Sequence, residues 1–516
     1  MSPLLIVALL LFAVLGAPLF AVFGAASMSL FAGLEDTSVT GAAHDVFSEK
    51  FADSPLMVTI PLFIFAGYML AESGTPRRIV ELSRAWLGWM PGGLAIVCIG
   101  ASAFFTTFTG GSGITIVAIG ALLYPALRQE NYPEKFTLGL VTASGSLGLL
   151  FPPSLPLILY GVVGGVLIEK LFLAGIIPGV LTMIALSVYA SVTGIREKMP
   201  KTPFVLRKAL AASWDGKWVI LLPVALLGGL LSGVLRIHEA AAFTAFYVLV
   251  VEVFIHREIS VHRDLPRIIR ESVTMFGAIL IILATAIGFT SFLIQAQVPQ
   301  KLLEAMEHVI TSPFMFLLTL NIFLLIVGML MDIFSAIVVV VPLIVPIAKH
   351  FGIDPYHVGI VFLLNLEIGY LTPPVGLNLF ISSYRFDKPI TLLYRAAMPF
   401  IGLLVVSLVL TTYVPVFSTF LPGLIDAKEI NLDGASGGGG DVPAELPAAD
   451  GGDDELTLDD LSLDDFELDD GGVEPDEAEP TPNAVAEPTP SDATPADPKK
   501  DDDDLSLDDL EAETNE

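Results

Sequence analysis

The sequence predicts an all-α protein that crosses a membrane many times and ends in an acidic tail. Of its 516 residues 54% are apolar and the mean hydropathy is +0.74, which is typical of a polytopic membrane protein. Apolar runs long enough for helical spans recur along most of the chain. The charge is divided unevenly, because residues 426–516 hold 32 acidic residues and 3 lysines, whereas residues 1–425 are neutral.

The tail at 426–516 is poor in aromatic residues and rich in Pro, Gly, Ala, Asp and Glu. Such a composition buries too little apolar surface to offset chain entropy, so we expect the tail to be disordered. The single cysteine, Cys98, excludes an internal disulfide, and its apolar neighbours favour a small buried side chain. The apolar N-terminus lacks a basic region and a clear cleavage site, so we expect it to stay in the membrane.

Spans are expected where apolar runs are separated by short polar segments. They lie near 3–34, 55–74, 92–127, 136–165, 170–193, 218–235, 239–256, 273–295, 313–348, 356–384 and 393–420. The first run forms one span or two short helices. The runs 92–127 and 313–348 are too long for one span, and each is interrupted midway, by TTFTGGSG and by GMLMDIFSA. Each of these two runs is therefore either two full spans or a re-entrant hairpin.

Two further spans are broken at their centres by a proline pair. ASGSLGLLFPPSLPLILYG (143–161) holds Pro152 and Pro153, and NLEIGYLTPPVGLNLFISS (365–383) holds Pro373 and Pro374. Proline deprives carbonyls one turn earlier of helical partners, and such carbonyls are hard ligands suited to Na⁺. The N-terminal end of the half-helix that follows suits an anionic group. A simple proline kink is the alternative for either segment alone, but two matched breaks predict a binding site.

The two breaks also predict an internal duplication, because the proline pairs are 221 residues apart. Residues that match at this offset include Gly148 and Gly369, Pro125 and Pro346, and Val117 and Val338. The duplication divides the chain into a first repeat at 1–193, a basic linker at 194–217, a second repeat at 218–425 and the tail. The broken helices are expected near 136–165 and 356–384.

Basic residues predict the orientation of the spans. They cluster at 77–84, 194–217, 256–270 and 385–395. All four clusters face the cytoplasm if 92–127 and 313–348 are re-entrant hairpins. If 3–34 counts as two short spans, each repeat then crosses five times. The second repeat is therefore inverted relative to the first, and the tail lies outside.

Four motifs resemble those of a known family. GGSGITIVAIGALLYPAL, ASGSLGLLFPPSLP, GMLMDIFSAIVVVVPLIVPIAKHFGIDPYHVGI and IGYLTPPVGLNLF are similar to the large membrane subunit, DctM type, of tripartite ATP-independent periplasmic (TRAP) transporters. The resemblance runs over about residues 3–422. It implies an elevator-type symporter of the ion transporter superfamily in the bacterial inner membrane, in which Na⁺ drives uptake of organic acids such as C4-dicarboxylates. It also implies two partners, a small four-span membrane subunit and a periplasmic solute-binding protein. The tail after residue 425 is not part of the resemblance, and its expected periplasmic location follows from the count of crossings alone.

The resemblance implies a site built from two hairpin tips and two breaks. The tips are the interruptions at 106–113 and 328–336, and the breaks are the segments around the two proline pairs. The coupling ion implied is Na⁺, with no other metal or cofactor. The Na⁺-binding residues implied are Gly110, Gly111, Ser112, Gly113, Ser144, Gly148, Pro152, Asp332, Ser335, Gly369, Thr372, Pro373 and Gly376. The residues implied to contact substrate are Ser154, Asn365 and Asn378. Hydroxyls and carbonyls suit hard cations, and side-chain amides can meet a substrate carboxylate or hydroxyl.

Two acidic residues, Asp332 and Glu367, lie in apolar surroundings. An acid at the centre of a membrane costs about 2.5–3.5 kcal/mol on insertion scales and usually has a purpose. Asp332 either helps an ion site or caps a half-helix. Glu367 aligns with Ser146 and either carries a coupled proton or holds the broken helix in place, and the sequence favours the structural role.

Other functions fit the sequence less well. A self-sufficient sodium–carboxylate symporter of the same superfamily, which needs no binding protein, is the first alternative. A membrane-embedded enzyme would need a nucleophile, metal or acid–base cluster, and no HExxH or GxSxG motif occurs in the membrane body, so we expect no enzyme. No GxxxxGK[ST] motif occurs either, so the chain shows no site for ATP. We expect the lipid bilayer as surroundings and no nucleic-acid partner.

Overall fold

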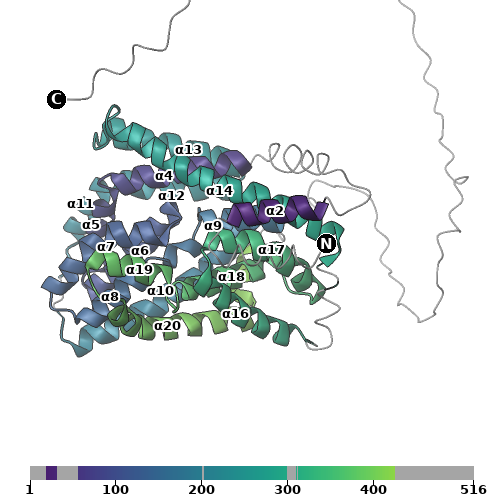
Figure 1. Ribbon diagram of the computed structural model, residues 1–516. Helices are drawn as coiled ribbons and strands as arrows, with labels where there is room; N and C mark the ends of the chain where they lie inside the picture. Colours follow the sequence, from purple (N-terminus) through teal and green to yellow (C-terminus); the bar gives the residue numbers. More distant parts are fainter. Residues whose placement is uncertain are drawn as a thin grey trace, which may run out of the picture. The chain divides into compact units, whose positions relative to one another are not determined.

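The structure is a computed structural model that describes residues 19–31, 56–199, 203–298, 301, 310 and 312–424. Every regular element in these ranges is a helix, which confirms the all-α prediction for this part of the chain (Figure 1). The acidic tail and most of the apolar run 3–34 lie outside the described residues, so the expectations about their structure stay predictions.

The helices follow the apolar runs closely. In the first part of the chain they are α2 (Leu19–Phe31), α4 (Leu56–Glu72), α5 (Thr75–Leu87), α6 (Gly93–Thr109), α7 (Ser112–Gln129), α8 (Glu134–Ser144), the 3₁₀ turn η2 (Leu147–Leu150), α9 (Leu155–Gly164) and α10 (Ile168–Arg196). The later elements are α11 (Leu206–Asp215), α12 (Lys217–Leu231), α13 (Ile237–Leu249), the π-helical turn η3 (Val250–Ile255), α14 (Asp264–Gln295), α16 (Pro313–Leu330), α17 (Ile333–His350), α18 (Pro355–Gly369), α19 (Leu377–Phe386) and α20 (Ile390–Tyr413).

Six of the described helices are long and apolar enough to cross a membrane, and the number is nine if each of three bent pairs makes one span. The bends are 72° between α4 and α5, 45° between α8–η2 and α9, and 70° between α11 and α12. Both α16 and α17 are among the six. Their length and composition fit two crossings as well as a re-entrant hairpin, so the hairpin topology stays a prediction.

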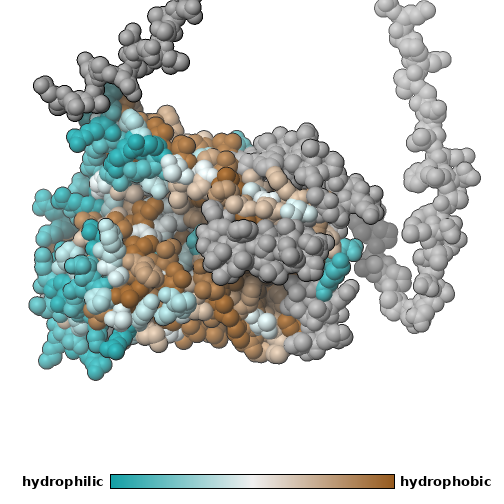
Figure 2. Space-filling model, viewed as in Figure 1, coloured by the Kyte–Doolittle hydropathy of each residue, from teal (hydrophilic) through white to brown (hydrophobic). Residues whose placement is uncertain are grey.

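The surface fits a membrane environment. Ile184, Val188, Val192 and Ile195 form a stripe along α10, and each is more than half exposed. A contiguous apolar stripe of this kind is rare on soluble proteins and normal where lipid covers it. Figure 2 shows hydrophobic residues across the middle of the described body, with hydrophilic residues gathered at the end where α5, α8 and α11 lie.

Polar contacts join the basic segments at this hydrophilic end. The contacts are Arg84–Glu130 at 3.1 Å, Lys388–Glu134 at 2.7 Å, Arg267–Glu72 at 2.6 Å, and a hydrogen bond from Trp86 Nε1 to Ser213 Oγ at 2.9 Å. The segments that the charge pattern places on one side of the membrane therefore lie close together. The segment 194–217, expected as a linker, includes the helix α11, because its Leu, Ala, Lys and Arg residues are good helix formers.

The order of helices from α6 to α10 recurs from α16 to α20. α7 begins at Ser112 and α17 at Ile333, 221 positions later, and α8 and α18 begin at Glu134 and Pro355, which are also 221 apart. The predicted interruptions of both long runs and of both broken helices are confirmed. The boundaries of the two repeats stay predictions.

The two halves pack against each other crosswise. α7 packs against α19, and its counterpart α17 packs against α9. In the same way α8 packs against α20, and α18 packs against α10. The second hairpin helix of each half therefore contacts the half-helix that follows the break in the other half, which brings the tips and breaks into one region.

Candidate functional site

The first break lies between α8 and α9, and its residues are buried. α8 ends at Ser144, the turn η2 follows, and the peptide bond between Pro152 and Pro153 is cis. Ser154 immediately precedes α9, and its hydroxyl is buried with no hydrogen-bond partner among the described residues. The N-terminal end of α9, with its partial positive charge, thus meets a buried hydroxyl that is available to a ligand.

Oxygen atoms converge between the first hairpin and this break. Thr106 Oγ1 of α6 lies 2.7 Å from Thr115 Oγ1 of α7 and 2.9 Å from the carbonyl oxygen of Gly145. Thr107 Oγ1 lies 3.4 Å from the carbonyl oxygen of Gly148. Both carbonyls belong to the broken segment, and the Gly148 carbonyl also accepts a hydrogen bond from the Phe151 amide. A group of hydroxyl and carbonyl oxygens without nitrogen suits a hard cation such as Na⁺.

The two threonines at the centre of this group were not among the predicted site residues. Thr106 and Thr115 are buried, and Thr106 Oγ1 also donates to the carbonyl of Ser102 in its own helix. The signals in the sequence were Thr106 at the start of TTFTGGSG and Thr115 just after this motif. A helical threonine commonly bonds its own preceding turn, so only the tertiary contact shows that its oxygen faces the break.

The glycines of the predicted site serve close packing. A Cβ on Gly148 would lie 2.2 Å from the carbonyl oxygen of Ala103, and a Cβ on Gly369 would lie 2.4 Å from the carbonyl carbon of Gly328. At the first tip Gly110 has a φ of +63°, and a Cβ there would lie 2.6 Å from the Leu155 side chain. These positions need glycine because backbone meets backbone or the start of α9 there.

The other predicted glycines lie at the starts of helices or against them. A Cβ on Gly113 would lie 2.7 Å from Ile381 of α19, and Gly111 adopts an extended conformation just before α7. Gly376 has a φ of +57° and immediately precedes α19. The first tip is therefore held between the starts of the two half-helices α9 and α19.

One hydrogen bond joins the first tip to the second break. Ser112 Oγ donates to Asn378 Oδ1 at 2.7 Å, and both side chains are buried. The side-chain amide nitrogen of Asn378 has no partner among the described residues. The structure thus brings a predicted ion-binding residue and a predicted substrate-binding residue into contact, although 266 positions separate them. The unpaired amide can donate to an anionic or hydroxyl-bearing ligand.

The second tip is held by a capping contact. The carboxylate of Asp332 accepts hydrogen bonds from the amides of Phe334 and Ser335, at 3.0 and 3.1 Å, and from the Ser335 hydroxyl. Asp332 therefore caps the N-terminus of α17, which was one of its two expected roles. The second break differs from the first, because Pro373 and Pro374 are exposed whereas Pro152 and Pro153 are buried.

Three predicted site residues have hydrogen-bond partners outside the contact of the first tip with the breaks. Ser144 Oγ donates to Ser102 Oγ of α6 at 3.2 Å, and Asn365 Nδ2 donates to Asn321 Oδ1 of α16 at 2.6 Å. Thr372 Oγ1 donates to the carbonyl of Ile368 one turn earlier in its own chain segment. No hydrogen bond among the described residues joins Asn365 to Asn378. The carbonyl oxygen of the Asn365 side chain is buried without a partner, so it retains the capacity to bind.

A family model described as tripartite ATP-independent periplasmic transporter, DctM component, matches residues 6–417. The chain belongs to the DctM family. It is therefore a multi-pass membrane component of a transporter and not an enzyme, as the sequence predicted.

Named relatives of this DctM-family chain agree with the match. It is 32% identical over 447 residues to the C4-dicarboxylate TRAP transporter large permease protein DctM of Vibrio cholerae, covering 83% of this chain and 98% of that protein. It is 34% identical over 415 residues to the isethionate TRAP transporter permease protein DctMQ of Oleidesulfovibrio alaskensis, covering 80% of this chain and 65% of that protein. The chain therefore spans less than two thirds of the second relative.

A solved structure has a similar fold. The crystal structure of the Alcanivorax borkumensis YdaH transporter matches with a TM-score of 0.55, covering 81% of this chain and 98% of that chain. The two sequences are 13% identical. At this identity the likeness shows the fold alone.

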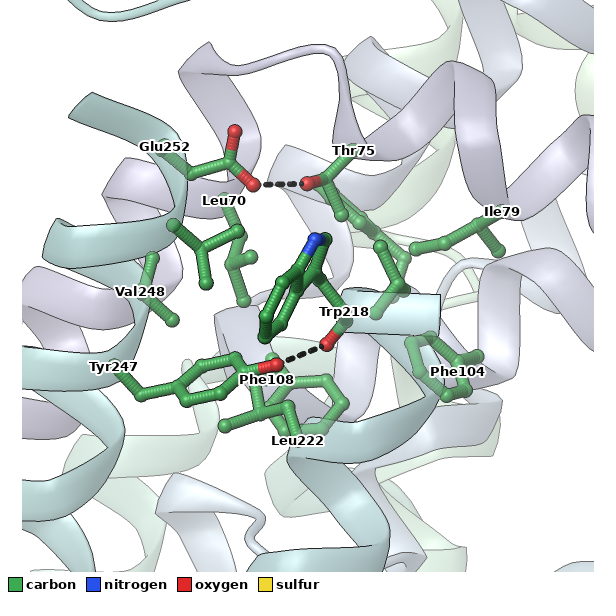
Figure 3. A pocket seen from close by; sticks show the side chains of 13 residues that line it. Leu70, Thr75, Ile79, Phe104, Phe108, Trp218, Leu222, Tyr247, Val248 and Glu252 are labelled. Atoms are coloured by element: carbon green, nitrogen blue, oxygen red, sulfur yellow. Dashed lines mark hydrogen bonds between the residues drawn. The ribbon is translucent and has the colours of Figure 1, made fainter. Parts of the chain in front are cut away.

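A pocket elsewhere in the DctM-family fold is too small for an organic acid. It lies among α4, α5, α6, α12 and α13 and is lined mostly by apolar side chains such as Phe104, Phe108 and Leu222 (Figure 3). Its volume is about 10 Å³, which is about the space of one water molecule. At its edge Thr75 donates a hydrogen bond to Glu252 at 2.8 Å.

Glu252 belongs to a charged cluster, the η3 cluster, that also contains His256, Glu258 and Arg78. One ligand atom each of Glu252, His256 and Glu258 lies within 4.8 Å of the others. Arg78 hydrogen-bonds to Glu258 and lies 3.9 Å from Glu252. A guanidinium in this position supplies the positive charge that a metal ion would otherwise bring, so the η3 cluster is an ion-pair cluster that ties α5 to η3.

Proposed function

We propose that this chain is the large membrane subunit of a Na⁺-coupled TRAP transporter, which takes up an organic acid delivered by a periplasmic solute-binding protein. The family match and the names of its relatives, for C4-dicarboxylate and isethionate, support an organic acid as substrate. The proposed location is the bacterial inner membrane, together with a small four-span membrane subunit. In the proposed orientation, with the basic segments on the cytoplasmic side, the acidic tail lies in the periplasm.

The observation that carries the proposal is the meeting of the first hairpin tip with both breaks. On one side Thr106 contacts both the Thr115 hydroxyl and the Gly145 carbonyl, and on the other side Ser112 donates to Asn378. Oxygen ligands for a hard cation and a free amide for an anion thus lie on either side of the first hairpin tip, which contacts both breaks. A cation bound on one side of the tip and an anion bound on the other would stabilise the same arrangement, so the affinity for one would depend on the other, as symport requires.

The crossed packing of the two halves supports an inverted-repeat transporter with an elevator movement. In this proposal α6–α10 and α16–α20 carry the site as one body, because they pack mostly against each other. α2, α4, α13 and α14, which pack against one another, form the scaffold. Secondary transporters of this kind place the site near the bilayer midplane, where broken helices of both repeats meet.

The test is uptake into proteoliposomes that contain the full chain and the small membrane subunit, with the binding protein added outside. A labelled C4-dicarboxylate should accumulate against its gradient in external Na⁺, and replacing Na⁺ by K⁺ at equal ionic strength should abolish the accumulation. Unchanged accumulation in K⁺ would refute sodium coupling. Equal uptake without the binding protein would instead indicate a self-sufficient symporter.

A further inference from the structure

Two charged helices, α5 and α11, pack against each other at one end of the described body (Figure 1). Each is joined to an apolar helix at a steep angle, which is 72° between α4 and α5 and 70° between α11 and α12. α4 and α12 are almost wholly apolar, whereas α5 carries three arginines and a glutamate, and α11 carries an arginine, a lysine and an aspartate. A short amphipathic helix that leaves a spanning helix at such an angle runs along the membrane surface.

Large apolar side chains of α11 face outward. Leu206, Leu210 and Trp214 recur at every fourth residue, so they share one face of the helix, and each is more than half exposed. We call this face the α11 stripe. Trp86 and Trp89, at the end of α5, are exposed as well. Leucine and tryptophan on one face of a helix are typical of helices that lie in the boundary between lipid and water.

A pocket lies where the α11 stripe begins. It is formed between α5 and the segment that leads into α11, and its volume is about 240 Å³, whereas one water molecule needs about 10–15 Å³. Arg84 and Lys208 line it together with two aromatic side chains, Trp89 and Phe204, whose ring centroids lie 6.4 Å apart. Positive charge beside aromatic rings, at the level of the membrane surface, suits the phosphate and glycerol of a phospholipid head group.

The charges of the pocket leave one cation unpaired. The ammonium group of Lys208 makes no hydrogen bond or ion pair with a described residue. Arg84 pairs with Glu130 at 3.1 Å, and Glu81, which also lines the pocket, pairs with Arg77 at 2.9 Å. Arg84 uses one terminal nitrogen for its pair and keeps N–H donors for a further acceptor. The lining therefore holds two cations and one carboxylate, an excess of positive charge that an anion would balance.

Positive charge also lies at the other end of the α11 stripe. Lys217 Nζ lies 4.2 Å from the ring centroid of Trp214 and 5.5 Å from that of Trp218, which are cation–π contacts. Arg207 is exposed and its guanidinium pairs with no described residue, and Asp215 is the single acid of α11. Anionic phospholipids attract basic segments at a membrane surface and offer acyl chains to the apolar residues beside them. A soluble acidic ligand would balance the charges but leave the α11 stripe exposed to water.

We propose that α5 and α11 form a binding site for an anionic phospholipid such as phosphatidylglycerol. The phosphate oxygens accept hydrogen bonds from the Lys208 ammonium and the Arg84 guanidinium in the pocket, and an acyl chain lies along the α11 stripe. Lys208 and Leu210 therefore test the two parts of the site separately. The site does not depend on the proposed function, because it concerns the attachment of α5 and α11 to the lipid surface rather than the transported acid or ion.

The native tryptophans report on this site. All four, Trp86, Trp89, Trp214 and Trp218, lie within α5 and α11 or just beyond their C-terminal ends, and bromine on a lipid acyl chain quenches the fluorescence of an indole that it contacts. The full chain is reconstituted into nanodiscs of phosphatidylcholine with an increasing fraction of brominated phosphatidylglycerol or, in parallel, of brominated phosphatidylcholine. Brominated phosphatidylglycerol should reach half-maximal quenching at a lower fraction of the lipid. Equal curves for the two lipids would overturn the proposal.

Lys208→Gln tests the phosphate contact. The fraction of phosphatidylglycerol that gives half-maximal quenching should rise by about fivefold, which is the contribution of one basic residue near an anionic membrane surface, and the curve for phosphatidylcholine should stay unchanged. Lys135→Gln is the matched control, because Lys135 is an exposed lysine at the start of α8, outside the pocket, and this variant should behave as the wild type. A Lys208→Gln protein that keeps the wild-type preference for phosphatidylglycerol would refute the site.

Leu210→Gln tests the acyl-chain contact, and Val192→Gln, on the exposed stripe of α10, is its control. Leu210→Gln should raise the fraction of brominated phosphatidylglycerol that gives half-maximal quenching, and Val192→Gln should not. Inorganic phosphate added at constant ionic strength should leave the quenching of the wild type unchanged, because a free phosphate has no acyl chain to place on the α11 stripe. Displacement of the lipid by inorganic phosphate, or a Leu210→Gln curve equal to that of the wild type, would refute a phospholipid as the occupant.

Discussion

Thr106 shows how one side chain can link a helix hairpin to a broken helix. Its hydroxyl contacts the Thr115 hydroxyl and the Gly145 carbonyl, and one hydrogen cannot serve all of its neighbouring acceptors. Oxygen atoms that are short of hydrogens are well placed to bind a cation. Thr106 is therefore the residue at which the proposed sodium site is tested most sharply.

Thr106→Val keeps the shape of the side chain and removes its oxygen. We expect the Na⁺ concentration for half-maximal uptake to rise by about tenfold, which corresponds to about 1.4 kcal/mol of lost binding. The measurement is the Na⁺ dependence of uptake in proteoliposomes. Thr244→Val is the matched control, because the Thr244 hydroxyl is buried but bonds only the Ala240 carbonyl of its own helix. The same Na⁺ dependence in both variants would show that Thr106 is not a ligand.

The oxygen-rich tip and breaks could be predicted at the residue scale, whereas the partner of each oxygen could not. GGSG and the proline pairs identify irregular backbone from local rules alone. The contacts of Ser112 with Asn378 and of Asn365 with Asn321 depend on which helices cross, and this is set by packing across the whole fold. Proximity in sequence to a break therefore predicts a site but does not sort its members into ligands and packing residues.

Close helix contacts at the scale of elements fix the position of both breaks. Gly148 lies against α6 and Gly369 against α16, at positions 221 residues apart. In each case the neighbour is backbone and cannot rotate away as a side chain can. A methyl group at either position must separate the two helices or distort the break.

Gly369→Ala should therefore lower the free energy of unfolding by about 1–3 kcal/mol, the usual cost of overpacking, and should reduce uptake. Gly402→Ala is the matched control, because Gly402 also lies within a helix but has no atom within 4 Å of the added Cβ. We expect the control to be neutral or slightly stabilising. Thermal unfolding in detergent measures both, and equal melting temperatures would show that α16 and α18 can separate without cost.

The η3 cluster fixes the bend between α4 and α5. Burial alone would raise the pKa of Glu258, but hydrogen bonds from the Arg78 guanidinium and from the Gly74 amide hold this pKa below its usual value of 4.5. A carboxyl group whose pKa is lower in the folded state stabilises that state above its ordinary pKa. This contribution is lost as the pH falls through the lowered value.

The melting temperature should accordingly decrease as the pH falls below about 4.5, and Glu258→Gln should remove part of that decrease. At neutral pH the variant should melt at a lower temperature than the wild type. Glu81→Gln serves as control, because Glu81 and Arg77 form an exposed pair within one helix, which contributes little. A Glu258→Gln protein with the acid sensitivity of the wild type would assign that sensitivity to other groups.

Glycine and proline signals explain which elements could be predicted. The interruption near 110 and both breaks coincide with clustered glycine or proline, and the interruption near 331 coincides with Asp332, which caps α17. Single prolines are weaker signals, because Pro125 and Pro346 lie inside helices. The 72° bend after α4 and the π-helical turn η3 were not predicted. Residues at the bend contact the η3 cluster, because Gly74 donates to Glu258 and Thr75 donates to Glu252, and contacts between segments so far apart leave no local pattern.

The arrangement of charge relates the whole molecule to the membrane. The basic segments gather at one end of the described body, and the acidic excess lies entirely in residues 426–516. If the basic end faces the cytoplasm and each repeat crosses five times, as we propose, the tail is expected in the periplasm. Its two LSLDD segments combine apolar residues with carboxylates, a composition that suits docking of a partner as well as solubility.

Protease added to intact spheroplasts should therefore remove the tail. If the tail docks a partner, truncation after Ile425 should weaken uptake, or its dependence on the binding protein. Added salt should weaken the same dependence in the wild type, because salt screens the tail's charge, over about 8 Å at physiological ionic strength. Cleavage only after the membrane is opened would contradict the topology. A tail that is cleaved, and whose loss changes nothing, would refute docking and leave the topology standing.

The crossed packing of the two halves has a consequence for biosynthesis. The contacts of Ser112 with Asn378 and of Ser146 with Glu367 cannot form until more than 200 further residues have been synthesised. The first half is therefore synthesised before its hairpin tip and its break can contact the second half. Contacts between residues so far apart in the sequence form slowly. Ser112 and Ser146 lack these partners during this interval, and the contact between the first tip and the second break forms only when the second half has been inserted.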